Sequence, residues 1–427
     1  MATIAQWKEA LACRALDEQL ERLSPGHASR QRGRLARGLA GFAAQWREQG
    51  PVRLFSAPGR TELGGNHTDH QGGRVLCAAV DLDTLVIAAP AEGETIELVS
   101  EGFSPCRVAL SDLAPRPSER GTTAALLRGV AAGLQAAGCA LGGARLYALS
   151  DVLPGSGLSS SAAFEVAVAA ALNGLFEGGR TPLELAAIGQ RAESGYFGKP
   201  CGMMDQVASA VGGIAQLDFA DPLRPAVTPL SCRWEDSGHR LCLVATGSSH
   251  ADLTEDYAAI PREMGEVAAW FGRERLCQVE EEALYANWAA LTQALGERPV
   301  LRAAHFFRED RRAAQEAQAL AQGDFCTFLQ LVRRSGRSSA LYLQNLYSPA
   351  RPRSQPLTAA LALCDRLLAG QGAYRVHGGG FGGTALVLLP DELAAPFCSA
   401  MEGALGPGCC RSLSIRPVGA VELALPR

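Results

Sequence analysis

The chain has 427 residues, of which 47% are hydrophobic and 20% charged, with a formal net charge of −4. This length allows two or three domains, and the composition is typical of a globular protein with a substantial core. The slight acidity, without clusters of Lys and Arg interleaved with aromatic residues, argues against a nucleic-acid-binding surface.

The ends and the cysteines indicate a compartment. Residues Met1–Glu9 lack the basic start, the apolar stretch and the cleavage site of a signal peptide, and no apolar run reaches the length of a membrane span. The thirteen cysteines are scattered without a Cys-x-x-Cys pair, and two of them, Cys409 and Cys410, are adjacent. This pattern favours reduced thiols packed as small hydrophobes over a disulfide framework or a zinc site. We therefore expect a cytoplasmic protein that binds neither nucleic acid nor membrane.

Periodicity predicts both helices and strands along the chain. The predicted elements are helices over 5–49, strands at 52–55, 75–89 and 144–150, helices at 162–176 and 181–194, a strand at 240–246, helices through about 262–346, a helix at 356–370, and strands at 373–377 and 384–389. This interleaving predicts an α/β or α+β class. A proline-rich shift in composition near 220–238 predicts a domain boundary there.

The segment 151–163, Asp-Val-Leu-Pro-Gly-Ser-Gly-Leu-Ser-Ser-Ser-Ala-Ala, is the most informative stretch. Its glycines allow a close approach of the backbone to a ligand, and three serines of the type that caps helices precede an apolar helix. A glycine loop that leads into a helix N-terminus forms an anion site, most naturally for phosphate. The alternative is a simple turn that starts a helix. No Gly-Lys-Ser/Thr follows, so this is not a Walker loop.

A second segment, Gly59–Gly73, is dense in hydrogen-bonding side chains and glycines. A buried sugar needs a polar partner for each hydroxyl, which such a segment supplies. The alternative is a polar surface loop. His67 and His70 also suggest a metal, but two histidines three residues apart outside a helix are weak evidence.

Two further segments carry chemistry. Glu193 and Asp205, the latter within Cys201–Gln206, flank a predicted helix break, which allows the chain to fold both carboxylates toward one place. The run His377–Gly383 contains more glycines than a hairpin turn requires, so we expect close packing against a ligand or another loop.

Together, these four segments resemble the motifs of the GHMP small-molecule kinases, and among them the galactokinase branch, in family order over most of the chain. The resemblance implies a two-lobed α+β fold with the active site in the cleft. The N-terminal lobe, residues 1–225, would resemble ribosomal protein S5 domain 2 and carry the sugar signature and the phosphate loop. The C-terminal lobe, residues 226–427, would be a ferredoxin-like α/β unit with the third, glycine-rich motif.

The resemblance also implies a monomeric, ATP-dependent kinase that converts galactose to galactose 1-phosphate. Its ATP would lie over Gly155, Ser156, Gly157, Leu158, Ser159, Ser160 and Ser161. Ser161 and Glu193 match the family's Mg²⁺ ligands, a chemically reasonable oxygen set. Asp205 matches the catalytic carboxylate, and Arg60 matches the arginine that holds it ionised. The positions that match sugar contacts are Asn66, His67, Asp69, Gly202 and Tyr257.

One departure from the galactokinase pattern concerns Glu62 and Asn66, which look exchanged relative to the usual Asn and Glu. We expect Glu62 to be structural, with its carboxylate held by neighbouring N–H groups. Asn66 is expected either to contact the C6 hydroxyl of galactose or to leave room for a C6 carboxylate. Galacturonate, galactosamine or arabinose is therefore an alternative substrate, and a galactose sensor without turnover is an alternative function.

Overall fold

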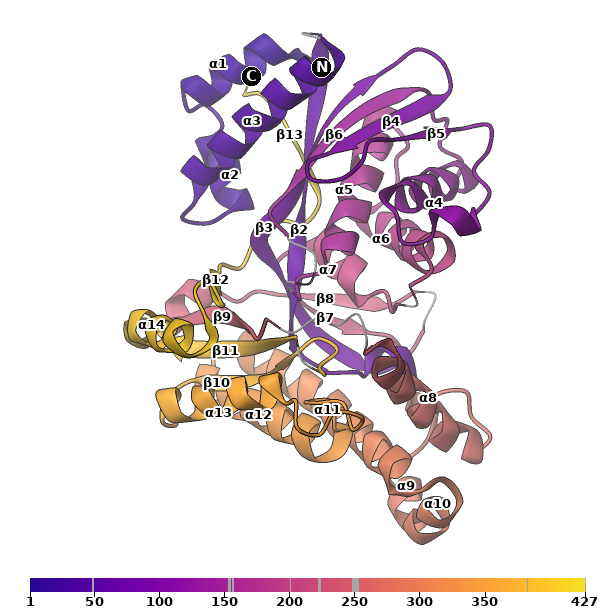
Figure 1. Ribbon diagram of the computed structural model, residues 1–427, viewed down its shortest axis with the longest axis vertical. Helices are drawn as coiled ribbons and strands as arrows, with labels where there is room; N and C mark the ends of the chain where they lie inside the picture. The colour runs from indigo at the N-terminus through magenta and orange to yellow at the C-terminus, as the bar shows by residue number, and fades with distance from the viewer. Residues whose placement is uncertain are drawn as a thin grey trace.

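The computed structural model (Figure 1) describes residues 1–47, 50–152, 155, 157–199, 201–221, 224–247, 253–381 and 383–426. A large mixed sheet dominates the N-terminal half, with strand order β1-β2-β3-β6-β4-β5. Strands β13 and β7 pair with β2 and β3, respectively, and β8 pairs with β7. The strands are β1 Ala2–Thr3, β2 Pro51–Gly64, β3 Arg74–Pro90, β4 Thr95–Ser100, β5 Cys106–Ala109, β6 Ala144–Ser150, β7 Ile214–Asp218, β8 Ala226–Leu230 and β13 Val421–Leu423.

Helices cover both faces of this sheet because its central strand is apolar on both sides. Leu85 and Ile87 of β3 pack with one set of helices, whereas Val86 and Ala88 point to the other. The first set is α1 Ile4–Ala12, α2 Asp17–Leu23 and α3 Ala28–Trp46. The second set is α4 Thr123–Ala136, α5 Ser160–Leu175, α6 Pro182–Arg191 and α7 Met204–Val211.

The second sheet is antiparallel, with strand order β10-β11-β9-β12. Its strands are β9 His239–Ala245, β10 Ala373–His377, β11 Thr384–Pro390 and β12 Cys410–Leu413. The helices of this half are α8 Thr254–Trp270, α9 Glu281–Ala286, α10 Trp288–Leu295, α11 Glu297–Ala321, α12 Phe325–Ser338, α13 Pro356–Leu368 and α14 Ala394–Leu405. The chain order and strand order match the ferredoxin-like arrangement.

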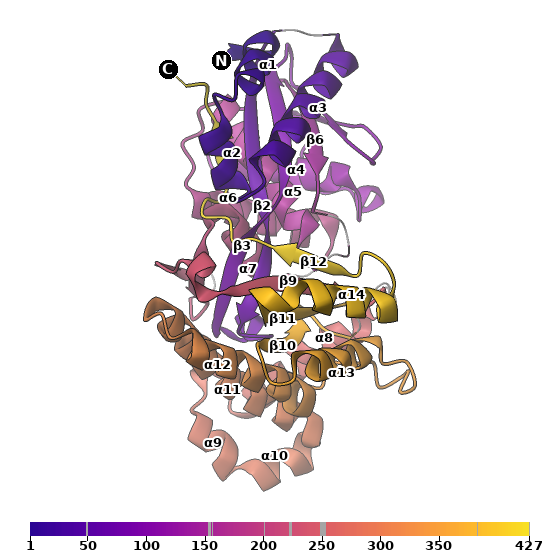
Figure 2. The same cartoon turned by 90° about the vertical axis from the view of Figure 1, so that its left-hand side faces the viewer.

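The two sheets share a hydrophobic cluster. Leu63 of β2 and Leu76 of β3 pack with Leu243 of β9 and Leu386 of β11. Both views show β2 and β3 running from the first sheet down to this junction (Figures 1 and 2). The fold is therefore two-lobed α+β, as expected. Strands β8 and β13 follow residue 225 in the chain but pair within the first sheet. The domain boundary expected after residue 225 therefore stays a prediction.

Strand β2 differs from its prediction. The apolar run 52–55 predicts a short strand followed by a loop, but β2 continues through Gly64. Register shifts between Pro58 and Arg60 and between Glu62 and Gly64 let it carry polar residues at its far end. Periodicity alone missed this extension because the polar residues there are buried, not solvent-facing. In the described part of the chain, no helix is long and apolar enough to cross a bilayer.

Candidate active site

Arg60 of β2 and Asp205 of α7 form a buried pair. Arg60 Nε donates to Asp205 Oδ1 at 2.5 Å, and Arg60 Nη1 donates to the Gly157 carbonyl at 2.6 Å. The Ser159 hydroxyl donates to Asp205 Oδ2. One arginine therefore joins the carboxylate to the glycine–serine loop.

This pair keeps Asp205 ionised. Burial alone would raise the pKa of Asp205, but the charge of Arg60 and hydrogen bonds from Arg60 and Ser159 outweigh it and leave the pKa below its usual value. Asp205 is thus a charged acceptor at neutral pH, at the first turn of α7.

The glycine–serine loop lies at the N-terminus of α5. Gly155 and Gly157 have positive φ angles of 76° and 77°, and Ser160 is the first residue of the helix. A Cβ on Gly157 would lie 2.6 Å from Thr384 Oγ1, so this loop packs closely against the second sheet. Leu158 is buried beneath it. Ser156 lies outside the described residues.

The expectation that these serines cap the helix is wrong for Ser159. It occupies the N-cap position with φ 56°, and its side chain makes no cap hydrogen bond. Its hydroxyl is engaged by Asp205 instead. The Ser159 side chain therefore does not cap the backbone N–H groups at the start of α5, and these groups can donate to another acceptor.

Ser161 and Glu193 come together on the other side of the loop. Ser161 Oγ donates to Glu193 Oε1 at 2.6 Å, and Lys199 Nζ lies 2.8 Å from the same oxygen. Gln206 Nε2 donates to Glu193 Oε2 at 2.8 Å. Glu193 lies in the π-helical turn Ala192–Phe197, a distortion often found at functional sites. Two hard oxygens this close fit a Mg²⁺ ion that keeps phosphate and water as its other ligands.

Another cluster contains the residues expected at the sugar. The rings of His67 and Tyr257 lie 5.2 Å apart between centroids. A Cβ on Gly202 would lie 2.1 Å from Asp69 Oδ2, so Gly202 leaves the room that this carboxylate occupies. Burial raises the pKa of Asp69, and the charge of Asp205 adds to this shift. The two carboxylates are therefore close enough for the negative charge of Asp205 to disfavour ionisation of Asp69.

His67 is a neutral ring with a defined tautomer. Burial and the neighbouring His70 lower its pKa to about 3. Its Nε2 lies 3.1 Å from the Gly379 carbonyl, which can only accept, so Nε2 carries the proton. Its Nδ1, 3.3 Å from His70 Nε2, is then the acceptor of a hydrogen bond from His70. These two hydrogen bonds fix the orientation of the ring. They engage both ring nitrogens of His67, the atoms that would otherwise bind a metal.

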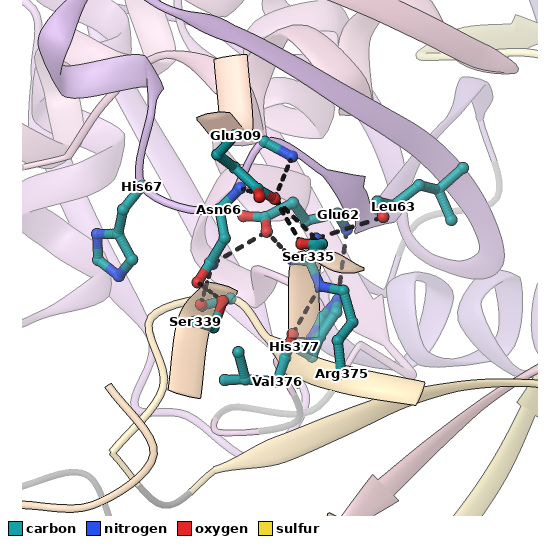
Figure 3. Close-up of polar contacts among 12 residues, drawn as sticks. Glu62, Leu63, Asn66, His67, Glu309, Ser335, Ser339, Arg375, Val376 and His377 are labelled. Atoms are coloured by element: carbon teal, nitrogen blue, oxygen red, sulfur yellow. Dashed lines mark hydrogen bonds and ion pairs between the residues drawn. The ribbon is translucent and has the colours of Figure 1, made fainter. Parts of the chain in front are cut away.

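Asn66 is fully hydrogen-bonded within the protein (Figure 3). Its Nδ2 donates to Glu62 Oε1 at 3.1 Å and to the Gly378 carbonyl at 2.7 Å. Its Oδ1 accepts from Asn345 Nδ2 at 3.0 Å and from Ser339 Oγ at 3.3 Å. An amide makes two donor and two acceptor bonds, so none is left for a sugar. A sugar contact by Asn66 would have to replace one of these four bonds, so the expected contact with the C6 group stays a prediction.

Glu62 is structural, but its partners differ from those expected. Its carboxylate forms a buried ion pair with Arg375 of β10 and accepts from Asn66, instead of from neighbouring loop N–H groups. The Glu62 N–H donates to His377 Nε2 at 3.3 Å. His377 is neutral because burial and the charges of Arg60 and Arg375 lower its pKa well below the usual value.

Glu309 of α11 holds the loop that follows β2. Its Oε1 accepts from the backbone N–H groups of Gly65 and Asn66, each at 3.3 Å, and from the Ser335 hydroxyl. Figure 3 shows Glu309, Asn66 and Arg375 meeting from separate elements. The loop that carries His67 and Asp69 is thus held by the C-terminal half of the chain.

The sequence missed the supporting residues of the site. Arg375 and His377 lie immediately before the glycine run, and this position beside a motif is the signal that could have found them. Glu309 and Asn345 carry no local signal, because they come from ordinary helical and loop sequence. Lys199 follows the helix break at Gly198, and the sequence pattern did not predict its contact with Glu193.

The comparisons with known proteins agree with this fold. The family model of the N-terminal domain of GHMP kinases matches residues 125–213, and that of the galactokinase galactose-binding signature matches residues 40–90. A crystal structure of Lactococcus lactis galactokinase complexed with galactose has a TM-score of 0.78 at 25% identity and covers 90% of this chain and 98% of its own. Methanococcus jannaschii mevalonate kinase shares the fold, with a TM-score of 0.61 at 16% identity and coverages of 86% and 99%.

The fold and the phosphate loop thus define a kinase of the GHMP class. Human galactokinase is 35% identical over 359 residues, covering 81% of this chain and 86% of its own. Galactokinase of Bos taurus is 34% identical over 358 residues, with the same coverages. The chain belongs to the galactokinase family.

Proposed function

We propose that this protein transfers the γ-phosphoryl group of ATP to the anomeric hydroxyl of galactose, giving galactose 1-phosphate and ADP. The observation that carries the proposal is the ionised Asp205, held by Arg60 beside the loop at the start of α5. Family membership supports ATP as the donor and galactose as the acceptor.

Asp205 acts on the sugar hydroxyl. As O1 forms its bond to the γ-phosphorus, its proton is taken or oriented by Asp205. The bond from the γ-phosphorus to the bridging oxygen breaks, and ADP leaves with that electron pair. Phosphoryl transfer depends on in-line positioning and charge neutralisation, and Arg60 serves both by fixing Asp205 and adding positive charge.

The N–H groups at the start of α5 bind phosphate oxygens, and Gly155, Gly157 and Leu158–Ser161 shape this cradle. Ser161 and Glu193 would hold Mg²⁺, whose chemistry there is to neutralise charge on the phosphates. Lys199 contacts the same carboxylate oxygen and keeps it paired in the free protein.

On the sugar side, we propose that Asp69, His67 and Tyr257 contact hydroxyls, and that Gly202 leaves room for them. His67 offers a neutral, oriented ring, and the Tyr257 side chain is 45% exposed, so it is reachable by a ligand. All thirteen cysteines are free thiols, which supports a cytoplasmic location. We also propose that the protein is a monomer.

A coupled assay of ADP release across galactose, glucose, galacturonate, galactosamine and arabinose tests the proposal, with the product identified by phosphorus NMR. We expect galactose to give the highest kcat/KM and a product phosphorylated at C1. Faster turnover of another sugar, or a phosphate on another carbon, would overturn it.

A further inference from the structure

Five of the thirteen cysteines gather in one corner of the C-terminal half, in the core between the second sheet and the helices α13 and α14. They are Cys242, Cys364, Cys398, Cys409 and Cys410. Cysteines used only as small hydrophobes need no such gathering. It was not predictable from the sequence, because Cys242 is far from the others along the chain.

Three of these thiols converge on one point. The Sγ atoms of Cys242, Cys398 and Cys410 all lie within 4.8 Å of one another. Cys409 Sγ lies 3.9 Å from Cys410 Sγ and is the nearest candidate for a fourth ligand. Thiolates around a tetrahedral Zn²⁺ ion, each about 2.3 Å from it, are separated by about 3.8 Å. A contraction of about an ångström would therefore bring these three thiols to the spacing of zinc ligands, with Cys409 or solvent in the fourth position.

The fold explains why these three meet. On the paired strands β9 and β12, Cys242 lies opposite Ser412 and Cys410 lies opposite Val244. Cys242 and Cys410 are therefore diagonal neighbours on one face of the sheet. Helix α14 packs over this face through Phe397 and Met401 and supplies Cys398.

The chemistry of the donors selects the ion. Three soft sulfur ligands without a carboxylate among them favour a thiophilic cation such as Zn²⁺ over Mg²⁺ or Ca²⁺. Cys242 is buried, whereas Cys398 and Cys410 are partly exposed, so an ion can reach the cluster from solvent.

We propose that Cys242, Cys398 and Cys410 form a structural Zn²⁺ site that fastens α14 to strands β9 and β12. On binding, each thiol releases its proton to solvent and forms a Zn–S bond. The site takes no part in phosphoryl transfer and does not rest on the proposed function. It stabilises the lobe that supplies Arg375 and His377 to the active site.

The test uses the full chain, stripped with a chelator and then titrated with Co²⁺ and Zn²⁺ in excess Mg²⁺. We expect one Co²⁺ per chain with the thiolate-to-cobalt charge-transfer absorption, displaced by Zn²⁺. Cys398→Ser and Cys410→Ser should each weaken binding by about a hundredfold or more, beyond the cost of losing an outer-shell partner. Cys326→Ser, at an exposed free thiol on α12, is the matched control and should bind as the wild type does.

A second readout covers variants that fold poorly. In the wild-type protein, Zn²⁺ should protect these three cysteines from alkylation, mapped by mass spectrometry, and raise the Tm by several degrees. The proposal is overturned if Cys398→Ser retains wild-type affinity, if no charge-transfer absorption develops, or if Zn²⁺ leaves the alkylation of all three cysteines unchanged.

Discussion

A buried carboxylate needs a nearby cation to offset the loss of its hydration. For Glu62 this cation is the guanidinium of Arg375. The exchange of Glu62 with Asn66 was visible in the sequence, and the structural role of Glu62 was predictable. Its partner was not, because Arg375 lies 313 residues away. The hydrogen bonds of Asn66 were not predictable for the same reason, and its contact with the sugar stays a prediction. Two of its four partners, Asn345 and Ser339, come from parts of the chain without a local signal.

Asn66→Glu should destabilise the protein and reduce turnover on every sugar to a similar extent. The new carboxylate would replace an amide whose Nδ2 lies 3.1 Å from Glu62 Oε1. Two like charges about 4 Å apart repel by about 4 kcal/mol at an effective dielectric of 20. Thermal unfolding and galactose kinetics measure both effects.

The double variant Glu62→Asn/Asn66→Glu is the matched control, because it restores one carboxylate and one amide. We expect it to recover at least half of the lost stability. A single variant with wild-type stability that changes only the preference between galactose and galacturonate would show that residue 66 reads C6 after all.

At the scale of elements, the site depends on places where a regular element is interrupted. Strand β2 bulges at Arg60, the turn after α6 is π-helical at Glu193, and Gly202 lies just before α7. Periodicity identified the helices because their apolar faces repeat. It predicted that the elements end near these positions but not what the interruptions do, because the residues that contact them lie on distant elements.

Gly202→Ala should raise the KM for galactose by about tenfold or more and leave the KM for ATP near its normal value. The added Cβ would lie 2.1 Å from Asp69 Oδ2, so this carboxylate must move. Gly195→Ala, in the same region with nothing within 4 Å of its Cβ, is the control. Steady-state kinetics on both substrates would refute this reading if the two variants behaved alike.

At the scale of the whole molecule, Asp83 of β3 joins the two ends of the chain to the first sheet. Arg34 of α3 pairs with its carboxylate, and Arg416 Nη1 lies 3.0 Å from Asp83 Oδ2. Both arginines are buried. The two-lobed class was predictable from the order of motifs, whereas this buried cluster was not, because its members are spread over the full length of the sequence.

Asp83→Asn should cost about 3–5 kcal/mol of unfolding free energy, since it leaves two buried guanidinium groups underpaired. Burial alone would raise the pKa of Asp83, but Arg34, Arg416 and its hydrogen bonds outweigh it and lower the pKa. A lowered pKa means that this contribution is complete above the usual carboxylate range and is lost as the pH falls through the folded-state value. The wild type should therefore lose stability in acid more steeply than the variant.

The control is Asp391→Asn, which removes an ion pair with Arg240 in which both side chains are about half exposed. It should cost less than about 1 kcal/mol. Urea unfolding at neutral and acidic pH compares the two variants. Equal losses would mean that Asp83 is not a structural centre.

The central claim is that Asp205, held ionised by Arg60, acts on the anomeric hydroxyl during phosphoryl transfer. The most direct test measures kcat for galactose with saturating MgATP, together with the Kd for galactose, in the wild type and in Asp205→Asn. Losing a positioned proton acceptor should lower kcat by about two to four orders of magnitude, while the amide keeps the Kd within about tenfold. A kcat near that of the wild type would contradict the account.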